Sequence, residues 1–482
     1  MPNSALLLDK FQRDHARAGA DIELGLRPPY LALLNRLGNP HKHLPPVFHV
    51  AGTNGKGSTC AFLRAMLEAA GKTVHVYTSP HLVRFHERIR IAGQLIEEEE
   101  FCWILEECAS LIEPGSLTLF EVTTAAALAA FARHPADFTI LEVGLGGRLD
   151  ATNVIEKPLA CLITRLSFDH RDYLGDTIEQ IAAEKAGIMR KGVPCFAATQ
   201  PDAGAMNTLI EKASEVGAFL RMADKDWHVR LNAQGDGFHY EDATQSLNLP
   251  LPSLVGEHQI ANAGLAIAAL QTAQPDPLPL VGRVREGGEQ QAHDIHMTGL
   301  PMAPLPYPPH EGEGITSVLP VGKDIIAQGL RNAEWPARLQ RIGQGSLAQI
   351  LPKGWELWLD GGHNDSAGEA LARQAKRWEE RDKLPLTLVC GMIATKRPRE
   401  FMAPLAPYAQ ELVAIAIPNE PLSFPAQDIA DEASAAGLRN IYLADSLMAA
   451  LRSCVSRTPA TPRRILVCGS LYLAGKVLKT AS

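Results

Sequence analysis

Residues 47–59 read VFHVAGTNGKGST, an apolar run followed by a glycine-rich turn with one lysine and two hydroxyl side chains. A strand that ends in such a turn and opens a helix directs backbone N–H groups and the positive end of the helix dipole at one point, which suits a phosphate. The spacing departs from G-x-x-x-x-G-K-[ST], because Gly57 separates Lys56 from Ser58. The plain alternative is a glycine-rich turn without a ligand. We predict a phosphate-binding loop, in which Lys56 reaches the terminal phosphates and Ser58 or Thr59 offers a hydroxyl to Mg²⁺.

Strand-length apolar runs alternate with longer helical segments from Val47 to about Val193. The expected strands are VFHV, TVHVY, FTILEV and ACLITRLSF, and the helical segment CAFLRAMLEAA stops at Gly71. This order predicts an α/β domain of the P-loop type, with a mainly parallel sheet and helices on both faces. Ligands of such sheets gather at the carboxyl ends of the strands.

A second alternating block runs from about Gln340 to the end of the chain. Its expected strands are WELWLD, LTLVCGM, LVAIAIP, NIYLAD and RILVCG, so we predict a separate α/β domain. Residues 272–319 between the blocks are rich in proline and glycine and show no helical or strand period, which favours a mobile linker or insertion. We therefore expect domains at 1–271 and 334–482, joined by residues 272–333.

Size and composition narrow the class of protein. The chain has 482 residues, which favours two or three domains, and its net charge of -8 argues against a general nucleic-acid or anionic-membrane surface. The eight cysteines form no C-x-x-C pair, which fits buried, reduced thiols in a cytoplasmic protein. The longest apolar stretch, Val122 to Ala132, is too short to span a bilayer. We expect a monomer with no signal peptide, no membrane anchor and no nucleic-acid partner.

Two residues at expected strand ends stand out as candidates for metal chemistry. Mg²⁺ prefers oxygen ligands, and Glu142 closes FTILEV before the turn GLGGR. A solvated strand-end acid is the alternative. His170 closes LITRLSFDH, although a lone histidine is more often a core residue. Thr177 and Gln180 form an expected capping box for a helix that carries Lys185, which on its own pattern is a solvated helix lysine.

The motifs together resemble folylpolyglutamate synthase and its bifunctional form with dihydrofolate synthase, within the Mur ligase superfamily. They cover nearly the whole chain and are GTNGKGST (52–59), TSPHL (78–82), ERI (87–89), LFE (119–121), EVGLGGRLDATN (142–153), SFDH (167–170), AAEKAGI (182–188), GEHQIANA (256–263), EWPARL (334–339) and LDGGHN (359–364). The resemblance implies an N-terminal nucleotide-binding domain and a C-terminal Rossmann-like domain. It also implies an ATP-dependent ligase that phosphorylates a substrate carboxylate and lets the amine of L-glutamate displace the phosphate.

The resemblance assigns roles to individual residues of this chain. It places catalytic functions on Lys56, Lys185, His170 and Arg338, and Mg²⁺ on Ser58, Glu142 and His170. It implies that Lys185 is carbamylated by CO₂ to a carboxylate-like ligand. The ATP-binding set that it implies consists of Gly52, Thr53, Asn54, Gly55, Lys56, Gly57, Ser58, Thr59, Asn262, Arg338, Asp360 and His363.

The same resemblance gives the expected substrates, which are dihydropteroate, reduced folates and L-glutamate. The pterin pocket is implied at Thr118, Phe120, Asp150 and Ala151, where an aromatic face can stack on a heterocycle and the carboxylate can accept hydrogen bonds from the pterin amino groups. The D-A-T-N stretch favours use of dihydropteroate as well as folates. Folylpolyglutamate synthesis alone, a Mur-type peptide ligase and a nucleotide-sensing module remain as alternatives.

Two small-residue departures from the family pattern are present. The usual WPGR reads WPAR and the usual DGAHN reads DGGHN, and both leave Arg338, Asp360 and His363 in place. We expect little harm from either exchange. The segment 272–319 is longer and richer in proline than the family's connection there.

Overall fold

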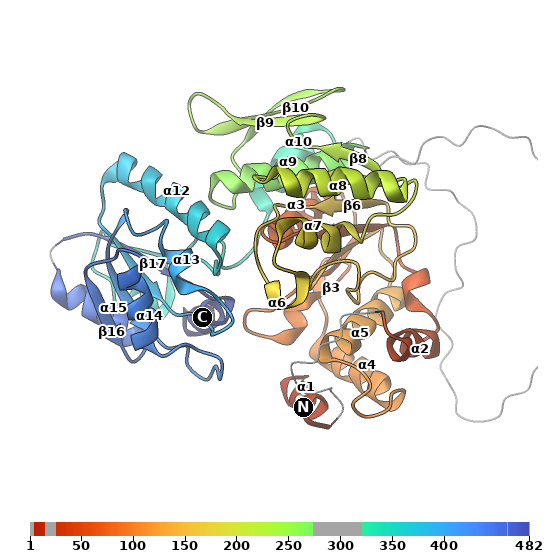
Figure 1. Ribbon diagram of the computed structural model, residues 1–482, viewed down its shortest axis with the longest axis horizontal. Coiled ribbons are helices and arrows are strands. Elements are labelled where there is room, and N and C mark those ends of the chain that lie inside the picture. The colour runs from red at the N-terminus through yellow and green to blue at the C-terminus, as the bar shows by residue number, and fades with distance from the viewer. Residues whose placement is uncertain (1–3, 15–25, 273–320, 460, 482) are drawn as a thin grey trace, which may run out of the picture.

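A computed structural model describes residues 4–14, 26–272, 321–459 and 461–481, which form two α/β bodies (Figure 1). The N-terminal body is built on an eight-stranded sheet in the order β4-β3-β2-β5-β1-β6-β7-β8. Its strands are β1 (Val47–Ala51), β2 (Val74–Tyr77), β3 (Ile89–Ile91), β4 (Gln94–Leu95), β5 (Phe138–Glu142), β6 (Ala160–Ile163), β7 (Pro194–Ala197) and β8 (Phe219–Met222). The six strands from β2 to β8 in that order are parallel, and β3 and β4 extend one edge as antiparallel strands.

Helices cover both faces of this sheet, as the alternating sequence pattern predicts. One face packs on α3 (Lys56–Ala69), α9 (Glu257–Thr272) and α10 (Lys323–Asn332). The other face packs on α4 (Glu98–Ser110), α5 (Leu119–Arg133), α7 (Ile178–Ala186) and α8 (Ala203–Val216). The remaining short elements are α1 (Ser4–Asp14), α2 (Pro28–Arg36), η1 (Pro40–Lys42), η2 (Phe85–Arg88) and α6 (Arg171–Leu174).

A three-stranded antiparallel sheet lies over α9 at the top of Figure 1, and the sequence analysis gave no expectation for it. Its strands are β9 (Trp227–Leu231), β10 (Gly237–Asp242) and β11 (Ser246–Pro250). Trp227, Phe238 and Tyr240 are buried in the same core cluster as the α9 side chains. These short strands lack the continuous burial of β5, because each of them contains exposed and half-buried residues.

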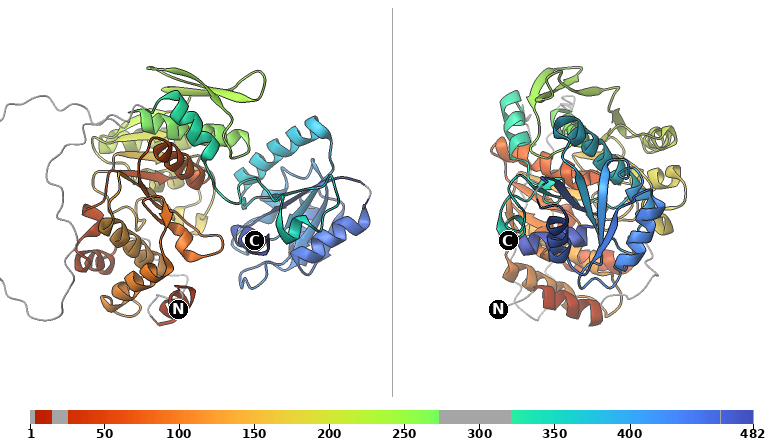
Figure 2. Two further views of the ribbon diagram at one scale, coloured as in Figure 1. Left: turned by 180° about the vertical axis from the view of Figure 1, so that it is seen from behind. Right: turned by 90° about the vertical axis from the view of Figure 1, so that its left-hand side faces the viewer.

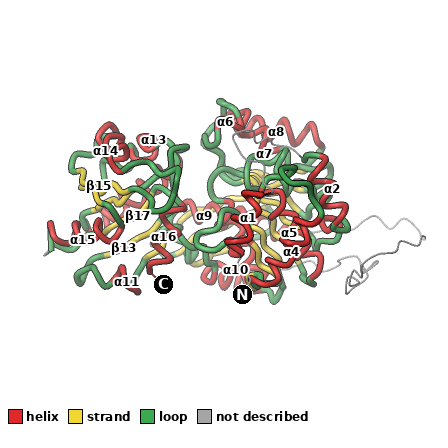
Figure 3. The backbone as a smooth tube through the Cα atoms, turned by 90° about the horizontal axis from the view of Figure 1, so that it is seen from below, coloured by secondary structure: helices red, strands yellow, loops and turns green. Residues whose placement is uncertain are grey.

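The C-terminal body is a six-stranded sheet in the order β12-β13-β17-β14-β15-β16, parallel except for β12. Figure 2 shows this blue body from behind and from its side. Its strands are β12 (Gln340–Arg341), β13 (Glu356–Leu359), β14 (Leu386–Cys390), β15 (Ala409–Ile415), β16 (Ile441–Ala444) and β17 (Arg464–Cys468). Its helices are α11 (Gly345–Ala348), α12 (Asp365–Asp382), α13 (Pro398–Met402), α14 (Ala426–Ala435), α15 (Leu447–Arg457) and α16 (Leu471–Ala481). In Figure 3 these helices flank the yellow strands on both sides, which confirms the predicted α/β class.

The predicted interdomain segment needs one correction. Residues 272–333 were expected to form a linker or insertion, but α10 is a helix whose Ile326 and Leu330 are buried in the core with α3. These apolar residues, four positions apart, place one helix face on the N-terminal body. Residues 273–320, where most of the predicted linker falls, lie outside the described residues.

Two expectations from composition can be checked directly. All eight cysteines are free and buried, as predicted. None of the helices in the described parts of the chain has both the length and the apolar character needed to cross a membrane.

Candidate active site

The carboxyl ends of β1, β5 and β6 bring three predicted segments to one edge of the sheet. Val50 of β1 pairs with Glu142 of β5, and Ala51 pairs with Ile163 of β6. The glycine-rich loop, residues 52–59, follows β1 and is tied to the segment after β6. The backbone N–H groups of Thr53 and Asn54 donate to the carbonyl of Arg165 at 3.0 and 3.1 Å.

The glycine-rich loop has the form of an anion site. Helix α3 begins at Lys56, and its N-cap Gly55 has a left-handed φ of 94°, which favours glycine. The ammonium of Lys56 donates to the carbonyls of Gly52 and Thr53 at 3.0 and 3.3 Å, so its charge lies over the loop. The Thr59 hydroxyl is buried and has no protein partner among the described residues. The N–H groups of a helix start, a lysine and an unpartnered hydroxyl together match the chemistry of a phosphate ligand.

Glu142 is a buried carboxylate, only 3% exposed, at the end of β5. One of its oxygens accepts from the backbone N–H of Ser79 at 3.2 Å. Burial raises the pKa of Glu142 to about 7, against the opposing charges of Lys56, Arg338 and Arg88. A carboxylate that is costly to ionise without a partner is well suited to a bound cation. Ser79 belongs to the TSPHL motif, yet the sequence analysis assigned it no role.

His170 and its neighbour Asp169 stand where β6 leads into α6. His170 has a left-handed φ of 52°, and burial lowers its pKa to about 4, helped by the charges of Lys396, Lys185 and Lys56 and opposed by Asp169. The ring is therefore neutral at pH 7, which is the form that binds a metal.

Lys185 is buried, so the solvated helix lysine that its sequence pattern predicted is wrong. Its side chain is buried, at 5% exposed, and its ammonium donates to the carbonyl of Gly52 at 3.0 Å. Burial, reinforced by the charge of Lys56, lowers the pKa of Lys185 to about 7. The helix that carries it begins as predicted, with Thr177 and Gln180 forming a capping box.

Asn262 of α9 lies against the glycine-rich loop. A Cβ on Gly55 would be 2.5 Å from its side-chain oxygen, and its amide donates to the side chain of Gln259 at 3.1 Å. Asn262 is buried, and the Gln259 amide nitrogen has no partner within the described chain. The predicted adenine contact therefore lies beside the predicted phosphate loop.

Two predicted ATP-binding residues lie at the start of the C-terminal body: Arg338 precedes β12, and Asp360 follows β13. Arg338 bonds to the carbonyl of Ala337 at 3.1 Å, and its charge acts on both Glu142 and Asp360. Asp360 accepts from the N–H groups of Leu339 and Gly362 at 2.8 and 2.7 Å. Burial raises the pKa of Asp360, and the charge of Arg338 opposes that rise. Asp360 therefore holds the turn that carries Arg338.

Polar contacts between the two bodies converge on Asp169 and Asn54. Asp169 accepts from Lys396 at 2.6 Å and lies 3.8 Å from the ring of His363. Asn54 and Asn364 exchange amide hydrogen bonds of 3.1 and 3.3 Å. Although burial opposes it, the nearby rings of His363 and His170 and the charge of Lys396 hold the pKa of Asp169 well below its usual range. Asn364 lies within the LDGGHN motif, whereas Lys396 belongs to none of the predicted motifs.

Phe120, one of the four residues expected to line the pterin pocket, lies on the first turn of α5. Its ring packs against Gly144, where an added Cβ would lie 2.4 Å from a ring carbon, and its centroid is 6.2 Å from that of Tyr77. Thr118 caps α5, and its hydroxyl donates to Glu121 at 2.9 Å. Phe120 therefore lies at the start of the loop that follows β5.

Asp150 is held by its own loop. One carboxylate oxygen accepts from the N–H groups of Gly144 and Leu145, each at 3.0 Å. The other accepts from the N–H and hydroxyl of Thr152 at 2.9 and 2.6 Å. Four donors occupy the carboxylate, so in this structure Asp150 shapes the loop, whereas the resemblance implied hydrogen bonds to a pterin. Ala151 is buried, and its carbonyl accepts from the Tyr30 hydroxyl at 2.9 Å.

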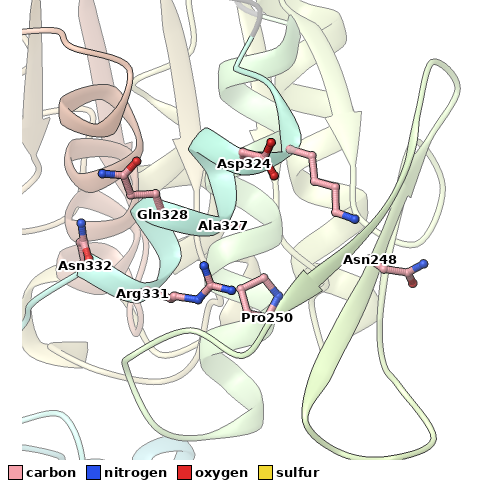
Figure 4. A pocket seen from close by; sticks show the side chains of 8 residues that line it. Asn248, Pro250, Asp324, Ala327, Gln328, Arg331 and Asn332 are labelled. Carbon is pink, nitrogen blue, oxygen red and sulfur yellow. The ribbon is translucent and has the colours of Figure 1, made fainter.

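A hollow of about 540 Å³ between β11 and α10 contains none of the predicted site residues (Figure 4). Figure 4 shows Asn248 and Pro250 on the strand beside Asp324, Gln328 and Arg331 on the helix. Its polar and charged lining is exposed. The hollow therefore lies apart from the sheet edge at which Lys56, Glu142 and Lys185 gather.

No group of three or more histidine, cysteine or acidic side chains gathers closely enough to hold a metal ion anywhere in the described segments. A divalent ion at Glu142 and His170 would therefore draw further oxygen ligands from a hydroxyl, water or phosphate. Mg²⁺ commonly takes such a set in nucleotide sites.

Comparisons with known proteins agree with this geometry. Residues 50–270 match the family described as Mur ligase middle domain, and residues 345–480 match dihydrofolate synthetase, C-terminal domain. The dihydrofolate synthase/folylpolyglutamate synthase of Bacillus subtilis (strain 168) is 36% identical over 357 residues, which cover 72% of this chain and 70% of that protein.

Solved structures show the same fold over nearly the whole chain. Escherichia coli FolC in complex with DHPP and ADP has a TM-score of 0.79 and 30% identity, covering 99% of this chain and 97% of that one. A bifunctional folylpolyglutamate synthase/dihydrofolate synthase with Mn, AMPPNP and L-glutamate bound has a TM-score of 0.75 and 29% identity, with coverages of 99% and 98%. The chain therefore belongs to the dihydrofolate synthase/folylpolyglutamate synthase family of ATP-dependent ligases.

Proposed function

We propose that this protein joins L-glutamate to dihydropteroate and to folate (poly)glutamates through an acyl-phosphate intermediate. The observation that carries the proposal is the convergence of Lys56, Glu142, His170 and Lys185 at one sheet edge, facing Arg338 from the second body. Lysine and arginine charges stabilise the negative charge that develops when a phosphoryl group is transferred. The relatives' names and bound ligands support the substrate class.

We propose that Glu142 and His170 bind the divalent ion, with Ser58 and the nucleotide phosphates completing its ligands. When bound, the ion neutralises charge on the ATP phosphates. Glu142 and a neutral His170 suit this role, because both lie near lysines; Glu142 is buried, and the half-exposed His170 ring is open to a ligand. The ammonium of Lys56 exchanges its carbonyl partners for phosphate oxygens when ATP enters.

Lys185 supplies a carboxylate in this proposal by carbamylation. The neutral amine attacks CO₂ to form an N–C bond and releases a proton, which leaves a carbamate anion on the side chain. A pKa of about 7 leaves roughly three-quarters of the amine neutral near pH 7.5, against about one part in a thousand for an ordinary lysine. Burial at 5% exposure also protects the carbamate from bulk water.

The reaction is tested by phosphate release with ATP and L-glutamate, with and without dihydropteroate or tetrahydrofolate, followed by mass spectrometry of the products. We expect phosphate release only when the acceptor and glutamate are both present. Release without glutamate would favour a nucleotide-sensing module. Glutamylation of folates alone would reduce the function to folylpolyglutamate synthesis, and turnover of UDP-sugar substrates would favour a Mur-type peptide ligase.

The carbamate is tested with Lys185→Ala, which should be nearly inactive and partly rescued by short carboxylates. Labelled ¹³CO₂ should give a carbamate signal in the wild type and none in Lys185→Ala. Lys212→Ala is the control, because Lys212 is a half-buried lysine of α8 that is paired with Glu215. Full activity of Lys185→Ala would contradict the carbamate.

A further inference from the structure

A buried histidine next to the glycine-rich loop has no role in the chemistry described above. His49 is on β1, is fully buried, and its Nε2 lies 2.9 Å from the hydroxyl oxygen of Thr152. That hydroxyl lies 2.6 Å from one carboxylate oxygen of Asp150. The other carboxylate oxygen accepts from the N–H groups of Gly144 and Leu145. A continuous hydrogen-bonded chain thus runs from the central strand to the start of the loop that follows β5.

The direction of each bond in this chain is fixed by the atoms available. The Asp150 carboxylate is surrounded by four donors and acts only as an acceptor, so the Thr152 hydroxyl gives it its single proton. The Thr152 oxygen then accepts from His49, which must carry its proton on Nε2. The Nδ1 atom of His49 has no partner in the described part of the protein. Burial, with the charge of Arg190, lowers the pKa of His49 to about 3, which keeps the ring neutral at pH 7.

The loop of residues 144–153 touches both sides of the reaction centre. At one end Gly144 lies against the Phe120 ring. In its middle, a Cβ on Gly147 would lie 2.9 Å from the carbonyl oxygen of Lys185, and the Arg148 N–H donates to the carbonyl of Glu184 at 2.7 Å. A displacement of this loop would therefore move both the pocket wall and the helix turn that carries Lys185.

We propose that His49 is a positioning residue, which through Thr152 and Asp150 sets the 144–153 loop between the acceptor pocket and Lys185. The proposal rests on the proposed glutamate ligation for its kinetic consequence. The contact that matters is the hydrogen bond from His49 Nε2 to the Thr152 hydroxyl oxygen. Loss of that donor leaves the buried Thr152 oxygen without its hydrogen bond. His49 is fully buried and would act through its contact with Thr152.

The kinetic test compares His49→Gln with His49→Leu. The glutamine amide nitrogen is the same number of bonds from Cβ as Nε2 and can donate to Thr152, whereas leucine cannot. His75→Leu is the matched control, since His75 is a fully buried histidine of β2 whose ring bonds to His134 and Ala92, away from the loop. If His49→Leu does not fold, Thr152→Val and Thr152→Ser provide the same contrast at the next residue of the chain.

We expect His49→Leu to lower kcat/KM for dihydropteroate by about tenfold or more, with KM for ATP changed much less. His49→Gln should stay within about threefold of the wild type, and His75→Leu should lose thermal stability without this kinetic change. Equal losses for His49→Gln and His49→Leu, or a His49→Leu enzyme with normal kcat/KM, would overturn the proposal.

A second measurement does not depend on enzyme activity. In ¹⁵N-histidine NMR spectra, His49 should be a neutral ring protonated on Nε2 from about pH 5 to 8. A ring protonated on Nδ1, or a charged ring, would overturn the donor assignment. A wild-type protein that shows this tautomer but releases no phosphate when ATP, glutamate and dihydropteroate or tetrahydrofolate are all present would instead contradict the proposed function.

Discussion

Replacing Glu142 with glutamine should stabilise the ligand-free protein at alkaline pH while it removes metal-dependent activity. Burial raises the Glu142 pKa from 4.5 to about 7, so the folded state holds this proton more tightly than the unfolded state. The sign follows from linkage: stability from this group is full below about pH 4.5 and is lost as pH rises through 7. A pKa difference of one corresponds to about 1.4 kcal/mol, so ionisation of this carboxylate above pH 7 lowers the free energy of unfolding by at most about 3 kcal/mol.

The measurement is urea unfolding of both proteins without Mg²⁺ near pH 5 and near pH 8. Glu142→Gln should gain about 1–3 kcal/mol over the wild type near pH 8 and almost nothing near pH 5. Added Mg²⁺ and a non-hydrolysable ATP analogue should then stabilise the wild type more than the variant.

The matched control is Glu121→Gln, the same chemical change at another buried carboxylate. Glu121 is bonded to Arg27 through both oxygens, at 3.2 and 2.5 Å, so removing its charge leaves a largely buried arginine poorly compensated. We expect this variant to lose stability near both pH values. A Glu142→Gln protein that is no more stable than the wild type near pH 8 would refute the reasoning.

Three further substitutions test the glycine-rich loop and the interdomain turn, which is the segment 333–339 between α10 and β12. Lys56→Ala should lower kcat about 100-fold or more, because it removes one preorganised charge from the transferred phosphate; near-normal turnover would refute the loop assignment. Ala337→Gly should raise stability to urea by about 0.5–1 kcal/mol, since Ala337 has a left-handed φ of 58° that glycine adopts without cost; unchanged or lower stability would count against strain at this turn. Gly57→Ala should weaken ATP binding and lower the melting temperature, because the added Cβ would lie 2.4 Å from the Trp335 ring; wild-type behaviour in calorimetry would contradict this close approach.

Much of the fold could be predicted because it depends on local patterns. The strand β1, the glycine-rich turn and the helix α3 follow one another within 23 residues, and every strand expected in the two α/β blocks is present. The capping box of α7 also depends on neighbours only three residues apart. Helix α10 was missed because it follows a long proline-rich stretch, so its short apolar pattern was grouped with that stretch.

The site was less predictable where it depends on contacts between distant residues. Lys185 has the pattern of a solvated helix lysine, and its burial arises because the loop from β5 packs its Gly147 on the Lys185 backbone. The bond between Lys396 and Asp169 joins residues 227 positions apart. Charge alone cannot select these partners, because the chain has 46 basic and 54 acidic residues.

The glycine that separates Lys56 from Ser58 illustrates how the two bodies constrain one short motif. From the sequence, Gly57 only weakened the match to a standard phosphate-binding loop. In the structure its face is covered by the ring of Trp335, which belongs to the same turn as Arg338. Any side chain at position 57 would push this turn away and move Arg338 from the charge of Glu142, on which it acts directly. The altered spacing is therefore explained by packing between the glycine-rich loop and the interdomain turn.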